Sequence, residues 1–111
     1  MSGYYVLEKK SSKFHFVLKA GNHETILSSQ GYTTRAAATG GIASCRTNAS
    51  KAAAFERKVA KNGQHYFVLH AANKQVIGQS ETYTSAAGRD KGIASVQRNA
   101  ATKTVKDLTE A

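Results

Sequence analysis

The sequence predicts an α+β protein in which two tandem β-β-β-α(-β) repeats form one antiparallel sheet with two helices packed on one face. Three observations lead to this prediction: an internal duplication, strand-like alternation before each predicted helix, and a change to helical spacing after each Tyr-Thr pair. We expect pseudo-twofold symmetry and exchange of the strands that follow the helices, because separate repeats would leave sheet edges exposed.

The duplication is read directly from the residues. With a constant offset of 51 and no gap, residues 16–49 and 67–100 are identical at 16 of 34 positions. We assign repeat one to 4–51 and repeat two to 54–108, within a single domain spanning 1–111. A half of about 50 residues buries too little apolar surface to fold alone, so we expect a monomer that mimics a dimer.

Three strands are predicted at the start of each repeat, over 4–9, 14–20 and 24–29, and over 54–59, 66–71 and 75–80. In the second strand of each repeat, Phe16 and Leu18, like Phe67 and Leu69, point to one face. Turn signals separate the strands: a polar turn at 10–13, Asn-Gly at 62–63, and turns at 22–23 and 73–74.

A helix follows in each repeat. Thr33-Thr34 and Thr84-Ser85 supply hydroxyl caps, and we expect the helices to run to about Asn48 and Asn99, where Asn can close the C-terminal end. One stripe of each helix should face the sheet; the stripes are Ala38, Ile42, Cys45 and Ala49, and Arg89, Ile93, Val96 and Ala100. A last short strand is predicted within 103–108.

Two helix glycines and the single cysteine of the sequence indicate how the helices pack. Gly41 and Gly92 lie inside the helices, at a cost of about 1 kcal/mol each relative to alanine, and indicate close approach to the sheet or to the other helix. Cys45 is the only cysteine, which excludes an internal disulfide and a multi-cysteine zinc site. We expect Cys45 to be a small buried side chain.

The recurring elements F-V-L-K-A-x-N, I…S…Y-T-[ST], G-I-A-S and N-A resemble the YegP-like family of small bacterial tandem-repeat proteins, from Tyr4 to about Leu108. The resemblance implies a β-β-β-α-β repeat paired with a second copy in a single sheet with exchanged C-terminal strands. It implies no established activity and no catalytic residues. The chain departs from the family pattern at His23 and Lys74, where a glycine commonly follows the turn asparagine.

The chain is basic, with 16 Lys and Arg against 7 Asp and Glu and a net charge of +9. Anionic partners are therefore worth considering, although the excess is spread over both repeats with no basic tail. No apolar run is long enough to span a bilayer, and we expect no membrane association. The N-terminus lacks the basic start and apolar stretch of a signal peptide, which predicts a cytoplasmic protein.

The sequence predicts no catalytic residues, no cofactor and no metal site. The four histidines have no metal-ligand spacing, and neither the serines nor Cys45 lie in a nucleophile motif. The isolated glycines form no phosphate loop. Tyr32 and Tyr83 recur just before the helices, and we expect their rings to pack over the sheet edge rather than to stack on a ligand.

The best candidate surface is the sheet face opposite the helices. Its candidate residues are Lys19, Arg57, Lys58, Tyr66 and His70. We expect a non-enzymatic binding or structural module with an unknown protein partner. The alternative is a weak, sequence-tolerant binder of single-stranded nucleic acid, which would use the basic groups and the aromatic ring of this face. A third alternative is that this surface is an ordinary solvent-exposed sheet face without a binding role.

Overall fold

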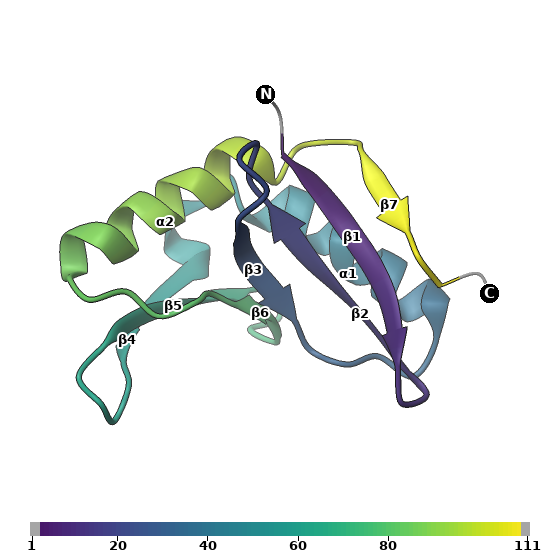
Figure 1. Ribbon diagram of the computed structural model, residues 1–111, viewed down its shortest axis with the longest axis horizontal. Helices are drawn as coiled ribbons and strands as arrows, with labels where there is room; N and C mark the ends of the chain where they lie inside the picture. Colours follow the sequence, from purple (N-terminus) through teal and green to yellow (C-terminus); the bar gives the residue numbers. More distant parts are fainter. Residues whose placement is uncertain (1–2, 110–111) are drawn as a thin grey trace.

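A computed structural model describes residues 3–109 and has the α+β architecture that the sequence predicts (Figure 1). The strands are β1 (Tyr4–Lys10), β2 (Lys13–Lys19), β3 (Thr25–Ser29), β4 (Phe55–Val59), β5 (His65–His70), β6 (Val76–Gln79) and β7 (Val105–Asp107). The helices are α1 (Arg35–Asn48) and α2 (Ala86–Asn99), and a short 3-10 helix, η1 (Ala52–Ala54), precedes β4.

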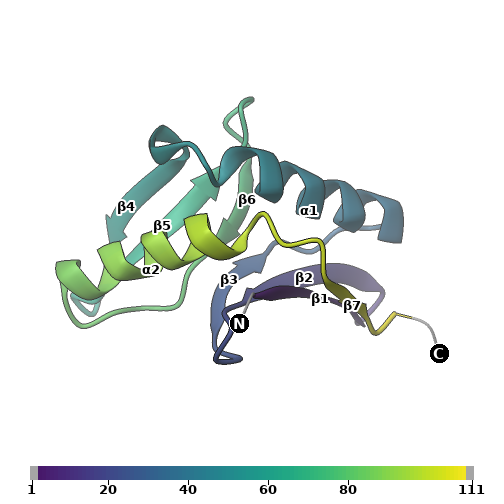
Figure 2. The same cartoon turned by 90° about the horizontal axis from the view of Figure 1, so that it is seen from above.

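The described strands form one seven-stranded sheet in the order β4-β5-β6-β3-β2-β1-β7. The repeats meet at its centre, where β3 and β6 pair through Ser28 with Gln79 and Ser29 with Gly78. Both helices pack on one face, α1 chiefly over β2 and α2 chiefly over β5 (Figures 1 and 2). Each helix also contacts strands of the other repeat, so the two repeats share one core.

The sheet is mixed, which corrects the expectation of a wholly antiparallel one. Six strands pair antiparallel, but β7 pairs parallel with β1. The reason is where α2 ends: a Cβ atom added at Gly3 would lie 2.7 Å from Asn99 Oδ1, so the helix ends beside the start of β1. The chain then leaves alongside β1 in the same direction, and the Tyr5 amide donates to the Thr104 carbonyl.

The predicted helix stripes form the buried side of both helices. Ala38, Ile42, Cys45 and Ala49 of the first stripe and Ile93, Val96 and Ala100 of the second are all buried. They pack on every second residue of the strands; these strand residues include Tyr5, Phe16, Leu18, Phe67 and Leu69. Arg89 takes the position of Ala38 in the second helix, and its guanidinium reaches Asp90.

The helices start and end where predicted, but Asn does not cap their C-terminal ends as expected. Thr34 Oγ1 and Ser85 Oγ each accept an amide hydrogen bond from the first turn of the helix that follows. At the other end, the C-caps Ala49 and Ala100 keep right-handed backbone angles. Asn48 instead donates from Nδ2 to the carbonyl of Ser44, four residues earlier, and Asn99 does the same with Ser95.

The glycines inside the helices allow the expected close approach. A Cβ atom at Gly41 would lie 2.4 Å from the Tyr32 hydroxyl, and one at Gly92 would lie 2.3 Å from that of Tyr83. The Tyr32 ring stacks on Phe16 at a centroid distance of 6.4 Å, and Tyr83 repeats this arrangement in the second repeat. Both tyrosines therefore pack against protein side chains as expected, but between helix and sheet and not over the sheet edge.

Candidate functional site

The predicted binding surface divides into two patches on the face of the sheet away from the helices. Lys58 lies opposite Tyr66 in the β4–β5 ladder, and His70 follows on the same face of β5. Lys19 also lies on this face, but β3 and β6 separate β2 from β5. Three strand spacings of about 4.8 Å put β2, which carries Lys19, roughly 14 Å from β5, and β4 with Lys58 lies one spacing farther.

Arg57 does not belong to this surface, which corrects its predicted placement. It pairs with Phe67, whose side chain is fully buried under the helices, so Arg57 points to the helix face. There its guanidinium lies 3.0 Å from the Asp90 carboxylate of α2. The hydrogen bond from Arg57 is the main reason that the pKa of Asp90 is lowered.

The patch around Lys19 contains an aromatic ring that the sequence reasoning did not assign to it. Tyr4 pairs with Lys19, and its hydroxyl lies 2.8 Å from His23 Nδ1. Lys106 of β7 lies over the Tyr4 ring, 4.7 Å from its centroid. Lys19 itself donates to Thr25 Oγ1 at 3.2 Å. Only the pairing of β7 with β1 brings Lys106 here, and the sequence does not specify that pairing.

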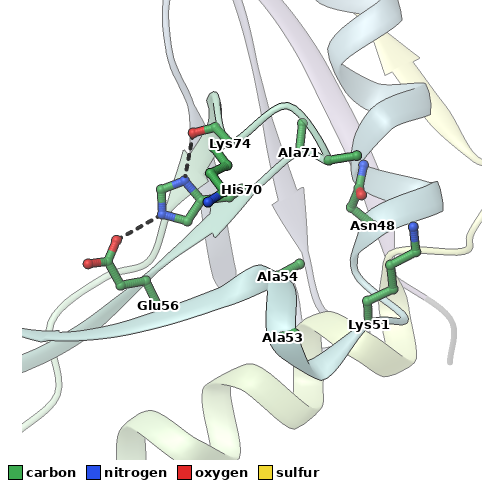
Figure 3. A pocket seen from close by; sticks show the side chains of 9 residues that line it. Asn48, Lys51, Ala53, Ala54, Glu56, His70, Ala71 and Lys74 are labelled. Atoms are coloured by element: carbon green, nitrogen blue, oxygen red, sulfur yellow. Dashed lines mark hydrogen bonds and ion pairs between the residues drawn. The ribbon is translucent and has the colours of Figure 1, made fainter.

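A further candidate site is a groove of about 490 Å³ at the end of α1, beside the β5–β6 turn (Figure 3). We call it the α1 groove. Its apolar lining consists of the small side chains of Ala53, Ala54, Ala71 and Ala72. Its polar lining consists of Asn48, Lys51, Glu56, His70 and Lys74.

A histidine organises the polar side of the α1 groove. His70 Nε2 lies 2.8 Å from Glu56 Oε1, and His70 Nδ1 lies 3.1 Å from the Lys74 carbonyl oxygen (Figure 3). The hydrogen bond with His70 is the main reason that the pKa of Glu56 is lowered. With Glu56 held by His70, Lys51 and Lys74 make the groove a site of net positive charge.

Two findings on the described residues concern metal binding and thiol chemistry. Within 3–109, no group of three His, Cys, Asp or Glu side chains could hold a metal ion. Cys45 is fully buried, and burial raises the pKa of its thiol to about 11. Neither α1 nor α2 is long and apolar enough to cross a membrane, a finding that applies to the described part of the chain.

Fold and site together define a small tandem-repeat protein with a shared core and an apolar groove. The chain belongs to the family whose model, a domain of unknown function (DUF1508), matches it twice, over residues 10–56 and 60–107. This confirms the resemblance to the YegP-like family noted in the sequence.

The relatives match over nearly their whole length. UPF0339 protein YegP of Escherichia coli O157:H7 is 53% identical over 110 residues, which cover 98% of this chain and 100% of the relative. A UPF0339 protein of Shewanella oneidensis is also 53% identical over 110 residues, with the same coverage of both chains. These relatives have no enzymatic name.

Two similar proteins have solution NMR structures. That of the UPF0339 protein SO3888 from Shewanella oneidensis matches with a TM-score of 0.92 at 53% identity and covers 98% of this chain and 93% of its own. That of yegP from E. coli, described as a protein of unknown function, matches with a TM-score of 0.94 at 50% identity. It covers 100% of this chain and 97% of its own.

Proposed function

We propose that the protein is a non-enzymatic binding module, acting as a monomer, that holds a segment of a partner protein in the α1 groove. The observation that carries the proposal is the lining of that groove. Four alanine methyl groups offer an apolar floor, and Lys51 and Lys74 place positive charge at the same site. An apolar floor with a few polar groups is the usual composition of a binding pocket in a protein.

Small probes test whether the α1 groove is a preferred binding site. We would record 1H–15N spectra during titration with isopropanol, which mimics an apolar side chain, and with acetate, which mimics a carboxylate. We expect saturable shifts of the amides of Ala54, His70 and Ala71.

A second hollow of about 410 Å³, lined by Ser28, Gln79 and Glu81, provides an internal control because its size is similar and its lining is more polar. Equal shifts at both hollows, or shifts at neither, would contradict the proposal.

Single-stranded nucleic acid is the second candidate, and one observation favours it. The outer sheet face presents two tyrosines, Tyr4 and Tyr66, each beside a lysine: Lys106 lies over the Tyr4 ring, and Lys58 pairs with Tyr66. Aromatic rings beside cations can stack bases and contact phosphates. The acidic side chains of Glu8 and Glu56 share this face, which weakens its attraction for a polyanion.

Fluorescence anisotropy of labelled single-stranded DNA and RNA, at low and physiological salt, separates this candidate from generic attraction to a basic protein. If the outer face binds, Lys58→Ala should weaken binding, whereas Arg57→Ala should not, because Arg57 lies on the helix face. The two variants change the net charge equally. Equal losses, or binding at low salt only, would exclude the outer face as a nucleic-acid site.

A further inference from the structure

At the α1 groove, the second repeat has an alanine where the first repeat has an aromatic ring. Tyr5 pairs with Leu18 in repeat one, and Phe55 pairs with Leu69, the counterpart of Leu18, in repeat two. The first strands of the two repeats are therefore related by an offset of 50, not 51. Ala54, the last residue of η1, precedes Phe55 as Tyr4 precedes Tyr5 and is therefore the counterpart of Tyr4.

Repeat one shows how this place is filled. Tyr4 directs its ring toward the turn after β2, where the ring lies edge-on to His23 at 5.7 Å and its hydroxyl meets His23 Nδ1. The counterpart of His23 is Lys74, and the counterpart of Lys19 beside Tyr4 is His70. Both counterparts line the α1 groove, together with Ala54. The space of a tyrosine ring is thus open in repeat two.

We propose that the α1 groove receives a tyrosine side chain from an acidic segment of a partner protein, in the position that Tyr4 occupies in repeat one. The proposal rests on the function proposed above and names the partner's chemistry. The ring would lie on the methyl groups of Ala54 and Ala71. The phenol oxygen would accept a hydrogen bond from the Lys74 ammonium, which takes the place of the His23 imidazole.

Charge complementarity specifies the rest of the segment. The charged groups of the groove other than the His70–Glu56 pair are Lys51 and Lys74, both cationic. Carboxylates flanking the tyrosine would meet these lysines at the rim. A basic segment would instead add like charges to a chain whose net charge is already +9.

Three capped peptides at physiological salt test the proposal: Glu-Tyr-Glu, Glu-Phe-Glu and Glu-Ala-Glu, each titrated into the 15N-labelled full chain. We expect the tyrosine peptide to shift the amides of Ala54, Ala71 and Lys74 saturably, the phenylalanine peptide to bind more weakly, and the alanine peptide to leave them unchanged. Binding of the alanine peptide as strong as that of the tyrosine peptide would overturn the proposal.

Two variants and a matched control locate the ring. Ala54→Tyr supplies it from within the chain and should weaken binding of the tyrosine peptide at least tenfold, whereas Ala52→Tyr adds the same ring outside the groove lining and should not. Lys74→Gly removes the ammonium and should make the tyrosine and phenylalanine peptides bind alike, a test that stands even if Ala54→Tyr does not fold. Unchanged tyrosine binding in both Ala54→Tyr and Lys74→Gly would contradict the proposal.

Failure here is distinguishable from failure of the proposed function. If isopropanol and acetate shift the groove amides but the tyrosine peptide binds no better than the alanine peptide, the groove remains a binding site and the tyrosine assignment is wrong. If neither the small probes nor any peptide shifts these amides, both proposals are wrong.

Discussion

Cys45 is the only cysteine of the sequence, and its surroundings determine how reactive its thiol is. It is fully buried between α1 and the sheet, and burial raises the pKa of its thiol to about 11. At pH 8 about one thiol in a thousand is then ionised, and the thiolate is the reactive form. We expect the folded protein to react with a disulfide reagent such as DTNB at least roughly a hundred times more slowly than the unfolded chain. Stoichiometric labelling of the folded protein at the unfolded rate would contradict this.

Lys74 adopts a backbone conformation that disfavours its side chain. Its φ is +69°. His23 and Gly63 occupy the same place in two similar turns, each directly after an asparagine, and have φ values of +70° and +83°. Left-handed geometry costs a residue with a Cβ atom roughly 1–2 kcal/mol. We expect Lys74→Gly to raise the free energy of unfolding by about 0.5–1 kcal/mol, after the entropic cost of glycine in the unfolded chain.

Gly63→Ala provides the matched control, because it introduces a Cβ atom at the same kind of position with open space around it. It should lower the free energy of unfolding by about 1 kcal/mol. Urea titration measures both variants. If the two changes had the same sign, the assignment of these turns would be wrong.

Adjacent glycines in α1 should respond in opposite ways to the same substitution. A Cβ atom at Gly40 meets nothing within 4 Å, whereas one at Gly41 would lie 2.4 Å from the Tyr32 hydroxyl and 2.9 Å from Phe16. We expect Gly40→Ala to stabilise the protein by up to about 1 kcal/mol, because alanine favours the helix. Gly41→Ala should destabilise it by about 1–3 kcal/mol through overpacking. Thermal unfolding of both variants checks the prediction, and stabilisation by Gly41→Ala would refute it.

The edge strand β7 depends on an ionised carboxylate. Hydrogen bonds from Thr109, the larger contribution, and from Arg35 of α1 lower the pKa of Asp107 to about 2. Because the folded pKa is below the unfolded value of about 3.9, this stabilisation is present above pH 4 and is lost as the pH falls toward 2. We expect the Leu108 amide, which donates to the Leu7 carbonyl, to lose hydrogen-exchange protection in that window. Asp107→Asn should abolish the pH dependence, and an unchanged dependence would contradict it.

The elements and most of their antiparallel pairing could be predicted because their apolar periods are strong, but the facing of Arg57 in β4 and the direction of β7 could not. The alternation in 14–20 and the stripe from Ala38 to Ala49 each identify a buried face without reference to the rest of the chain. β4 has no such pattern: after Phe55 it runs through three charged residues, and only its register with β5 reveals that Arg57 faces the helices. The direction of β7 likewise depends on where α2 ends in space, which local sequence does not specify.

The gapless sequence alignment did not reveal the α1 groove, because one turn differs in length between the repeats. The first hairpin of repeat two is one residue longer than that of repeat one. Lys9 pairs with Phe14, five positions later, whereas Val59 pairs with His65, six positions later. The gapless alignment therefore places Tyr4 opposite Phe55 and conceals that Ala54 stands where Tyr4 stands. Allowing for this extra residue in the alignment would have indicated the groove. The alignment then places the alanine Ala54 opposite the aromatic Tyr4.

The repeats are expected to unfold together, because each helix packs on strands of both. α2 contacts β5 of its own repeat and also β2 and β3 of the other, and Ile93 belongs to the shared core. Truncating a buried isoleucine to alanine costs about 2–5 kcal/mol. If the molecule is one cooperative unit, a cost incurred in repeat two must also reduce the stability of repeat one.

Native-state hydrogen exchange of Ile93→Ala against the parent protein measures this directly, with amides of β2 reporting on repeat one and amides of β5 on repeat two. We predict that the free energy of opening falls by the same amount, about 2–5 kcal/mol, in both strands. A loss confined to β5, with β2 protected as in the parent protein, would show that the repeats fold separately and would contradict the shared sheet and core described above.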